Sequence, residues 1–200
     1  MRSLLYKDLI NMKQQARNMA LVVVIWMVIS LQNGNLVFLG GLLAVYAVLF
    51  PITAYAFDEK SGWDKYGLAL AYTRKQMVIS RYLLGIMSLV VSMALVGILG
   101  VVIRADFAQL IPEIGAFIAV GVVILSLTLP VVFKLGVEQG RLILMAICML
   151  PILIGLAGEK LFPDMAVNLQ LITYVGAALP VVLLPASVWI SLRIYEKKEF

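Results

Sequence analysis

The chain has 200 residues, of which 63% are apolar and 14% charged, and its formal net charge is +5. Its mean hydropathy is +1.03, which excludes a soluble domain, because a domain of this size could not bury so much apolar surface, and predicts an integral membrane protein. The absence of His excludes His-based catalysis and most zinc sites, so we expect no metal site, and the single Cys148 excludes a disulfide within the chain.

The first segment, residues 1–17, mixes polar and apolar side chains ahead of the first long apolar run. Leu5, Leu9, Met12 and Ala16 fall on one face of a helix, at i, i+4, i+7 and i+11. This spacing favours an amphipathic helix that lies along the inner surface of the membrane. A solvated segment leading into the first span is the alternative.

Long stretches without Asp, Glu, Lys or Arg then follow, at residues 18–57, 82–103, 114–133, 142–158 and 165–192. A helix needs about 20 apolar residues to cross the hydrocarbon core, so the first stretch is long enough for two spans, divided by the polar turn at residues 32–35. The sequence therefore predicts an all-α, polytopic membrane protein. Its six transmembrane helices are expected near residues 18–33, 36–57, 82–103, 113–133, 142–158 and 167–192.

The distribution of basic residues predicts the orientation of these spans. Of the 16 Lys and Arg residues, all but Arg104 and Lys160 fall on the same side of the membrane as the two termini. Because Lys and Arg are enriched on the cytoplasmic side, we expect both termini in the cytoplasm. The basic excess thus indicates membrane topology and attraction to anionic lipid, and we expect no binding to nucleic acid.

Residues 58–81, DEKSGWDKYGLALAYTRKQMVISR, form the longest connection between predicted spans and are rich in charged and aromatic residues. Trp63, Tyr66 and Leu70 are spaced i, i+3 and i+7, so a helix would present them on one face. Two interpretations stay open at this point. The segment is either an interfacial helix anchored by Trp and Tyr among lipid headgroups, or a docking helix that binds a cytoplasmic protein.

Prolines recur within or near the predicted spans. Each removes one backbone hydrogen bond of its helix and favours a kink, which is tolerated where a neighbour satisfies the freed carbonyl. Kinks suit a pathway that opens and closes, although proline is common in membrane helices of every function. These prolines are Pro51, Pro130, Pro151, Pro180 and Pro185.

The predicted spans contain almost no charged residues. Pumps driven by ion gradients carry ionisable groups at membrane depth, so an external energy source and an amphipathic or lipid-like cargo are favoured here. The candidate lining residues have an alternative role in hydrogen bonding to their own helices. They are Ser92, Thr128, Gln170 and Thr173.

Three stretches carry a resemblance to a known family: the start MRSLLYKDL, the middle FDEKSGWDKYGLALAYTRKQMVISRYLLG and the end SLRIYEKKEF. In these stretches and in its layout, the chain resembles permease subunits of type-2 ABC exporters. It is most similar to the short six-span group that includes exporters of phenol-soluble modulins and of bacteriocins or lantibiotics. Many members have Pro where this chain has Ala71, which affects the local bend.

The resemblance implies a function and a set of partners. The chain, residues 1–200, would be one permease domain of a bacterial plasma membrane, would pair with a second identical or related permease, and would export amphipathic peptides. It would have no catalytic activity, since a separate cytoplasmic subunit would bind ATP and Mg²⁺. Residues 1–17 would be the elbow helix and residues 58–81 the coupling segment. The residues implied to dock onto the ATPase are Glu59, Lys60, Trp63, Asp64, Lys65 and Tyr66.

Two other classes of protein compete with this interpretation. A membrane-bound enzyme would need clustered carboxylates, His or a Ser–Lys pair at one depth, and the sequence shows no such cluster. A passive membrane protein, such as an immunity factor, a sensor partner or a scaffold, would share the topology and have no ATPase partner.

Overall fold

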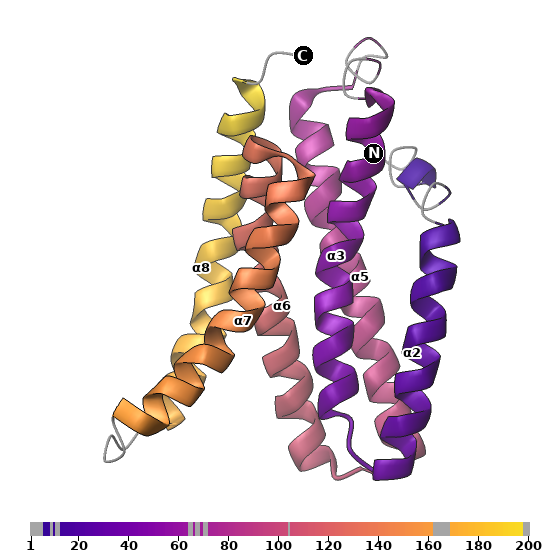
Figure 1. The fold of residues 1–200 in the computed structure, drawn as a ribbon, viewed down its shortest axis with the longest axis vertical. Helices are drawn as coiled ribbons and strands as arrows, with labels where there is room; N and C mark the ends of the chain where they lie inside the picture. Colours follow the sequence, from indigo (N-terminus) through magenta and orange to yellow (C-terminus); the bar gives the residue numbers. More distant parts are fainter. Residues whose placement is uncertain are drawn as a thin grey trace.

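The computed structural model describes residues 6–8, 10, 13–63, 66, 69, 72–103, 105–161 and 169–197, and it describes side chains within these ranges except at 13–16, 151–175 and 177. The described residues form long helices and no strand, which confirms the predicted all-α class. The helices, labelled as in Figure 1, are α2 (Lys13–Asn33), α3 (Val37–Ser61), α5 (Arg74–Val102), α6 (Phe107–Leu135), α7 (Val137–Leu161) and α8 (Leu169–Glu196).

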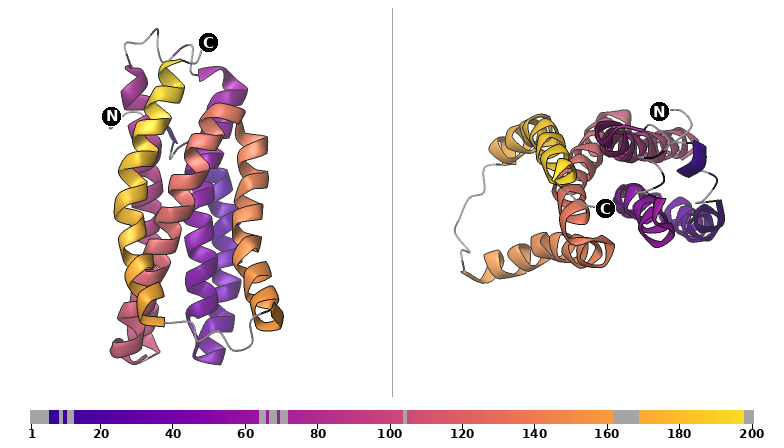
Figure 2. Two further views of the ribbon diagram at one scale, coloured as in Figure 1. Left: turned by 90° about the vertical axis from the view of Figure 1, so that its left-hand side faces the viewer. Right: turned by 90° about the horizontal axis from the view of Figure 1, so that it is seen from above.

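Successive helices run in opposite directions, so both termini lie at one end of the bundle (Figures 1 and 2). The connection between α3 and α5 and the short turn between α6 and α7 lie at the same end. Because most of the Lys and Arg residues of the described helices are found here, we call it the basic end. The two termini therefore share one end of the bundle, and the side of the membrane that this end faces stays a prediction.

Four helical segments of the described chain are long and apolar enough to cross a membrane, and Arg17–Asn33 is a shorter apolar helix. These findings confirm a multi-pass membrane protein, while the number of crossings stays a prediction. The four segments are Val37–Ser61, Arg74–Val102, Phe107–Leu135 and Ala178–Glu196. The predicted apolar face of residues 1–17 falls on residues whose side chains lie outside the described part of the chain.

Capping residues determine where α3 ends and α5 begins, and the connection between the two helices is shorter than the predicted segment 58–81. Gly62 adopts the left-handed conformation (φ 66°) that ends α3, and its N–H bonds the carbonyl of Glu59 at 3.4 Å. Thr73 and Gln76 form a reciprocal capping box that starts α5. Both helices thus extend into the predicted segment 58–81, and the connection between them is residues 62–73.

Helices α5 and α6 approach closely where glycine on one helix faces leucine on the other. A Cβ atom added to Gly85 would overlap a methyl group of Leu125, and one added to Gly121 would overlap a methyl group of Leu89. Lipid tails are as apolar as leucine, so helix pairing in a membrane depends on such close packing. The glycines therefore specify the contact between α5 and α6.

The proline within α3 produces a hydrogen bond between helices. Pro51 lacks the N–H that would bond the carbonyl of Ala47, four residues earlier. The hydroxyl of Ser88 on α5 donates to this carbonyl at 2.7 Å. The freed acceptor thus becomes a contact between α3 and α5.

Pro130 in α6 acts in the same way at the junction with α8. It frees the carbonyl of Ser126, and the hydroxyl of Ser187 on α8 donates to that carbonyl at 2.5 Å. The hydroxyl of Tyr82 on α5 lies 2.5 Å from the Ser187 hydroxyl and 2.8 Å from that of Ser191. This buried polar network joins α5, α6 and α8.

Among the residues that were candidates for lining a transport pathway, Thr128 instead forms a hydrogen bond within its own helix. Its hydroxyl donates to the carbonyl of Ile124 at 2.7 Å. Ser92 lines an apolar groove between α2, α3 and α5. The side chains of Gln170 and Thr173 lie outside the described ones.

We predict that Ser187→Ala destabilises the protein by about 1–3 kcal/mol, because the buried Ser126 carbonyl loses its donor. Pro130→Ala restores the N–H that bonds this carbonyl within α6, so the double variant should lose less stability than the two single losses combined. Thermal unfolding in detergent of the two single variants and the double variant measures this coupling. Strictly additive losses would contradict the assigned role of Pro130.

Candidate functional site

Four charged residues meet at the basic end, from the N-terminal segment, the end of α3 and the start of α5. We call Lys7, Asp8, Asp58 and Arg81 the ionic cluster. Arg81 bridges the two acids, with Nη1 2.6 Å from Oδ2 of Asp8 and Nη2 bonded to Oδ2 of Asp58. Lys7 Nζ lies 2.6 Å from Oδ1 of Asp58 and 3.3 Å from Oδ1 of Asp8. Two cations thus neutralise two carboxylates.

The cluster is almost completely removed from solvent. The side chains of Asp8, Asp58 and Arg81 are 2%, 4% and 6% exposed, and only Lys7, at 19%, reaches the surface. A buried charge without its partner is strongly unfavourable, so the four residues stabilise one another only in this arrangement. The cluster therefore holds the N-terminal segment against α3 and α5.

From the sequence, Lys7 and Arg81 were expected only to lie on the same side of the membrane as the termini, and the burial of the four charges was not predicted. A signal was present: Asp58 directly follows one apolar stretch and Arg81 directly precedes the next. Opposite charges at the facing ends of two antiparallel helices are placed to pair. What the sequence did not reveal is that Lys7 and Asp8 fold back onto that pair.

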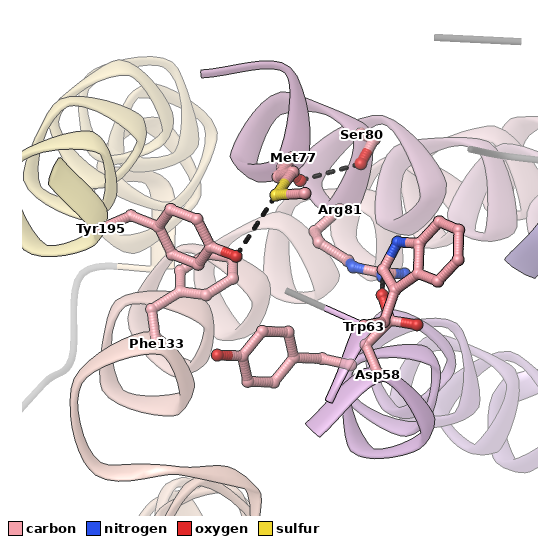
Figure 3. Close-up of a pocket in the computed structure, with 8 residues that line it drawn as sticks. Asp58, Trp63, Met77, Ser80, Arg81, Phe133 and Tyr195 are labelled. Atoms are coloured by element: carbon pink, nitrogen blue, oxygen red, sulfur yellow. Dashed lines mark hydrogen bonds and ion pairs between the residues drawn. The ribbon is translucent and has the colours of Figure 1, made fainter. Parts of the chain in front are cut away.

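Trp63 of the predicted docking set points into the bundle beside the cluster (Figure 3). Nζ of Lys7 lies 4.3 Å from the centre of its ring, a cation–π contact. Its buried Nε1 has no hydrogen-bond acceptor among the described residues. With Asp58 and Arg81, the ring lines a cavity of about 10 Å³, which is too small for any ligand larger than a water molecule.

Three aromatic side chains that also line this cavity pack together and join three helices. The ring of Phe133 on α6 lies edge-to-face with Tyr55 on α3, at 5.3 Å between centres, and with Tyr195 on α8, at 5.7 Å. The hydroxyl of Tyr195 donates to the sulfur of Met77 on α5 at 3.5 Å. Such pairs favour fixed relative orientations, so α3, α5, α6 and α8 meet in one arrangement at this depth.

The residues that flank the connection 62–73 also contact the ends of α7 and α8. Oε2 of Glu59 accepts the N–H of Val137 at the start of α7, at 3.4 Å. Nη1 of Arg74 donates to the carbonyls of Tyr195 and Glu196 at the end of α8, at 3.0 and 2.6 Å. An acid at a helix start and a base at a helix end both complement the helix dipole. The residues on either side of the connection thus bond the start of α7 and the end of α8.

The predicted docking residues divide into two groups. Lys60 is exposed and Tyr66 is 65% exposed, so we call these two the outer face of the connection. Glu59 is exposed but bonded to α7, and Trp63 packs inward against Lys7. Asp64 and Lys65 lie outside the described residues.

Arg81→Gln should lower the free energy of unfolding by about 3–5 kcal/mol, because it leaves two buried carboxylates with one cation. Asp58→Asn combined with Arg81→Gln keeps the balanced pair of Lys7 and Asp8, so we expect a smaller loss than for Arg81→Gln alone. Thermal unfolding in detergent measures both losses. The control is Arg193→Gln, which removes an exposed cation stacked on a Trp ring, and an equal loss for Arg81→Gln and this control would refute the role of the cluster.

Comparison with known protein families identifies a family that the chain matches over nearly its whole length. A family model described as "ABC-2 family transporter protein" matches residues 3–196, which run from the N-terminal segment to the end of α8. No curated protein and no solved structure gives a significant match to the chain.

Proposed function

The chain belongs to the ABC-2 family of transporter proteins, and we propose that it is the permease subunit of an exporter driven by a separate ATPase. Family membership makes it a membrane component of an ABC transporter. The finer proposal is that it moves amphipathic peptides of toxin or antimicrobial type out of a bacterial cell. Both termini and the basic end would face the cytoplasm, where the ATPase subunit would bind ATP and Mg²⁺.

The observation that carries this proposal is the set of bonds around the connection 62–73. Asp58 and Glu59 precede the connection and Arg74 follows it. Asp58 bonds the N-terminal segment and α5. Glu59 bonds the start of α7, and Arg74 bonds the end of α8. A cytoplasmic subunit that moves this connection would therefore move the ends of several helices together. Such a joint response is what coupling of ATP hydrolysis to transport requires.

The two groups of docking residues would have different roles in this coupling. We propose that Lys60 and Tyr66 contact the ATPase subunit, with Asp64 and Lys65 completing the surface. An exposed aromatic side chain beside charged residues is typical of an interface anchor with a polar rim. Glu59 and Trp63 would instead act as positioning residues, which transmit movement to α7 and to the ionic cluster.

The distribution of charge supports an external energy source. Along the described helices, charged residues lie only within about two turns of a helix end. A transporter driven by protons or sodium ions needs ionisable groups at membrane depth, and the described spans do not supply them. A pathway with so little charge favours cargo that is itself largely apolar. We further propose that two permeases, identical or related, pair to enclose this pathway.

The first test is purification of the tagged protein from its native membrane in mild detergent. We expect an ATPase subunit to co-purify in stoichiometric amount. Lys60→Ala with Tyr66→Ala should weaken its binding roughly thirtyfold, because an aromatic anchor contributes about 2 kcal/mol to an interface. The matched control is Lys197→Ala, which removes an exposed cation at the same end. Mass spectrometry and ATPase assays give the readouts.

Trp63→Ala separates the positioning role from docking. We expect this variant to retain the ATPase subunit but to lose ATP-dependent uptake of an amphipathic helical peptide into inverted membrane vesicles. Unchanged uptake would contradict the coupling role. A chain that purifies alone, without ATP hydrolysis, would instead support the passive class: an immunity factor, a sensor partner or a scaffold.

A further inference from the structure

An apolar groove of about 390 Å³ lies between α2, α3 and α5. This volume is within the usual range for ligand pockets, roughly 300–1,000 Å³. Helix α2 stands at the outer side of the bundle (Figures 1 and 2). The groove extends along α5 from Leu84, one turn beyond the ionic cluster, to Leu95. At 1.5 Å per residue this length is about 16 Å, or half of a hydrocarbon core of about 30 Å.

The groove opens sideways between α2 and α5. Met87 and Val91 form its rim on α5 and are 49% and 67% exposed. Helix α2 packs chiefly along α3 and leaves the side toward α5 open. Because both residues lie in the apolar stretch 82–103, the opening faces the hydrocarbon of the membrane and not water.

The lining suits an alkyl chain. Among the described residues, those that line the groove include no charged one, and the polar ones are Tyr46, Ser88 and Ser92. The hydroxyl of Ser88 is already bonded to the carbonyls of Ala47 and Gly85. An occupant of the groove therefore gains mainly from burial of its apolar surface.

Basic residues precede the groove-lining part of α2. Arg17 is exposed on α2, two residues before the lining residue Met19, and forms no ion pair with any described residue. Lys13 stands one turn earlier in the sequence of α2. Asp8, the acid of the described N-terminal segment, is bound to Lys7 and Arg81. A cation at the level of the headgroups attracts anionic lipid.

We propose that this groove binds an anionic phospholipid of the leaflet at the basic end, with one acyl chain along α5 and the phosphate beside Arg17. The length of the groove, half of a hydrocarbon core, matches the chain of a lipid in one leaflet. A second copy of the protein, whose helices cross the whole membrane, would require a longer contact. The bound chain completes the packing of α2, and the site does not depend on the proposed export.

The test is native mass spectrometry of the full chain in detergent with phosphatidylglycerol or phosphatidylcholine. We expect one retained lipid per chain, with phosphatidylglycerol preferred. Ala20→Phe, which fills the groove from an exposed position on α2, should abolish retention. Ala116→Phe, at an exposed position on α6, is the control and should retain the lipid. Equal retention by the two variants overturns the proposal.

The headgroup contact has its own pair of variants. Arg17→Gln should keep the lipid but reduce the preference for phosphatidylglycerol about fivefold, whereas Lys75→Gln, at an exposed position on α5, should leave that preference unchanged. Equal affinity of the unmodified chain for both lipids overturns the anionic assignment. Loss of a dimer in Ala20→Phe without loss of lipid would identify a second copy as the occupant.

Labelling of the unmodified protein avoids reliance on variants that fail to fold. A phosphatidylglycerol with a photoreactive group on its acyl chain should label Met87 or Val91 on the groove rim. Labelling spread evenly over the exposed faces of α6 and α8 would overturn the proposal.

Discussion

The arrangement of the basic end depends on the mutual neutralisation of Lys7, Asp8, Asp58 and Arg81. Charges buried at 6% exposure or less are tolerated only with their partners in place. The need for neutralisation pairs residues that are 73 positions apart in the sequence, Asp8 and Arg81. It joins a segment that precedes the bundle to the helices that flank the connection 62–73. Apolar packing alone would allow these helix ends to slide, whereas paired charges permit only one register.

The serine–proline contacts have a similar role deeper in the bundle. Apolar surface does not distinguish a neighbouring helix from lipid, so the hydrophobic effect cannot select which helices pair. A carbonyl freed by proline can select, because it needs a donor from a specific position on a neighbour. Ser88 meets the carbonyl freed by Pro51, and Ser187 meets the one freed by Pro130. These prolines therefore also help to select which helices pair.

Helical class, membrane location and the family were predictable, because each depends on local composition or on a contiguous motif. The sequence also showed that freed carbonyls need donors, but the identity of Ser88 and Ser187 depends on how the helices are arranged. The burial of Asp58 and Arg81 was not predictable from local pattern, since the same charges next to apolar stretches are usually solvated. The environment of Trp63 was also not predictable from local pattern. Its spacing with Tyr66 suggests that the two rings share one face of a helix, yet Lys7 packs on the ring of Trp63 and the ring of Tyr66 is exposed.

The ionic cluster and the groove meet through the N-terminal segment. Asp8 is bound to Arg81, and Arg17, nine residues later in the sequence, precedes the groove-lining residue Met19 on α2. Leu84 of the groove lies one helical turn from Arg81 on α5. A shift of α3 against α5 would therefore strain the cluster and change the width of the groove together. A lipid in the groove and a partner on the outer face of the connection would act on the same helix ends. Binding at either site would therefore change the free energy of binding at the other.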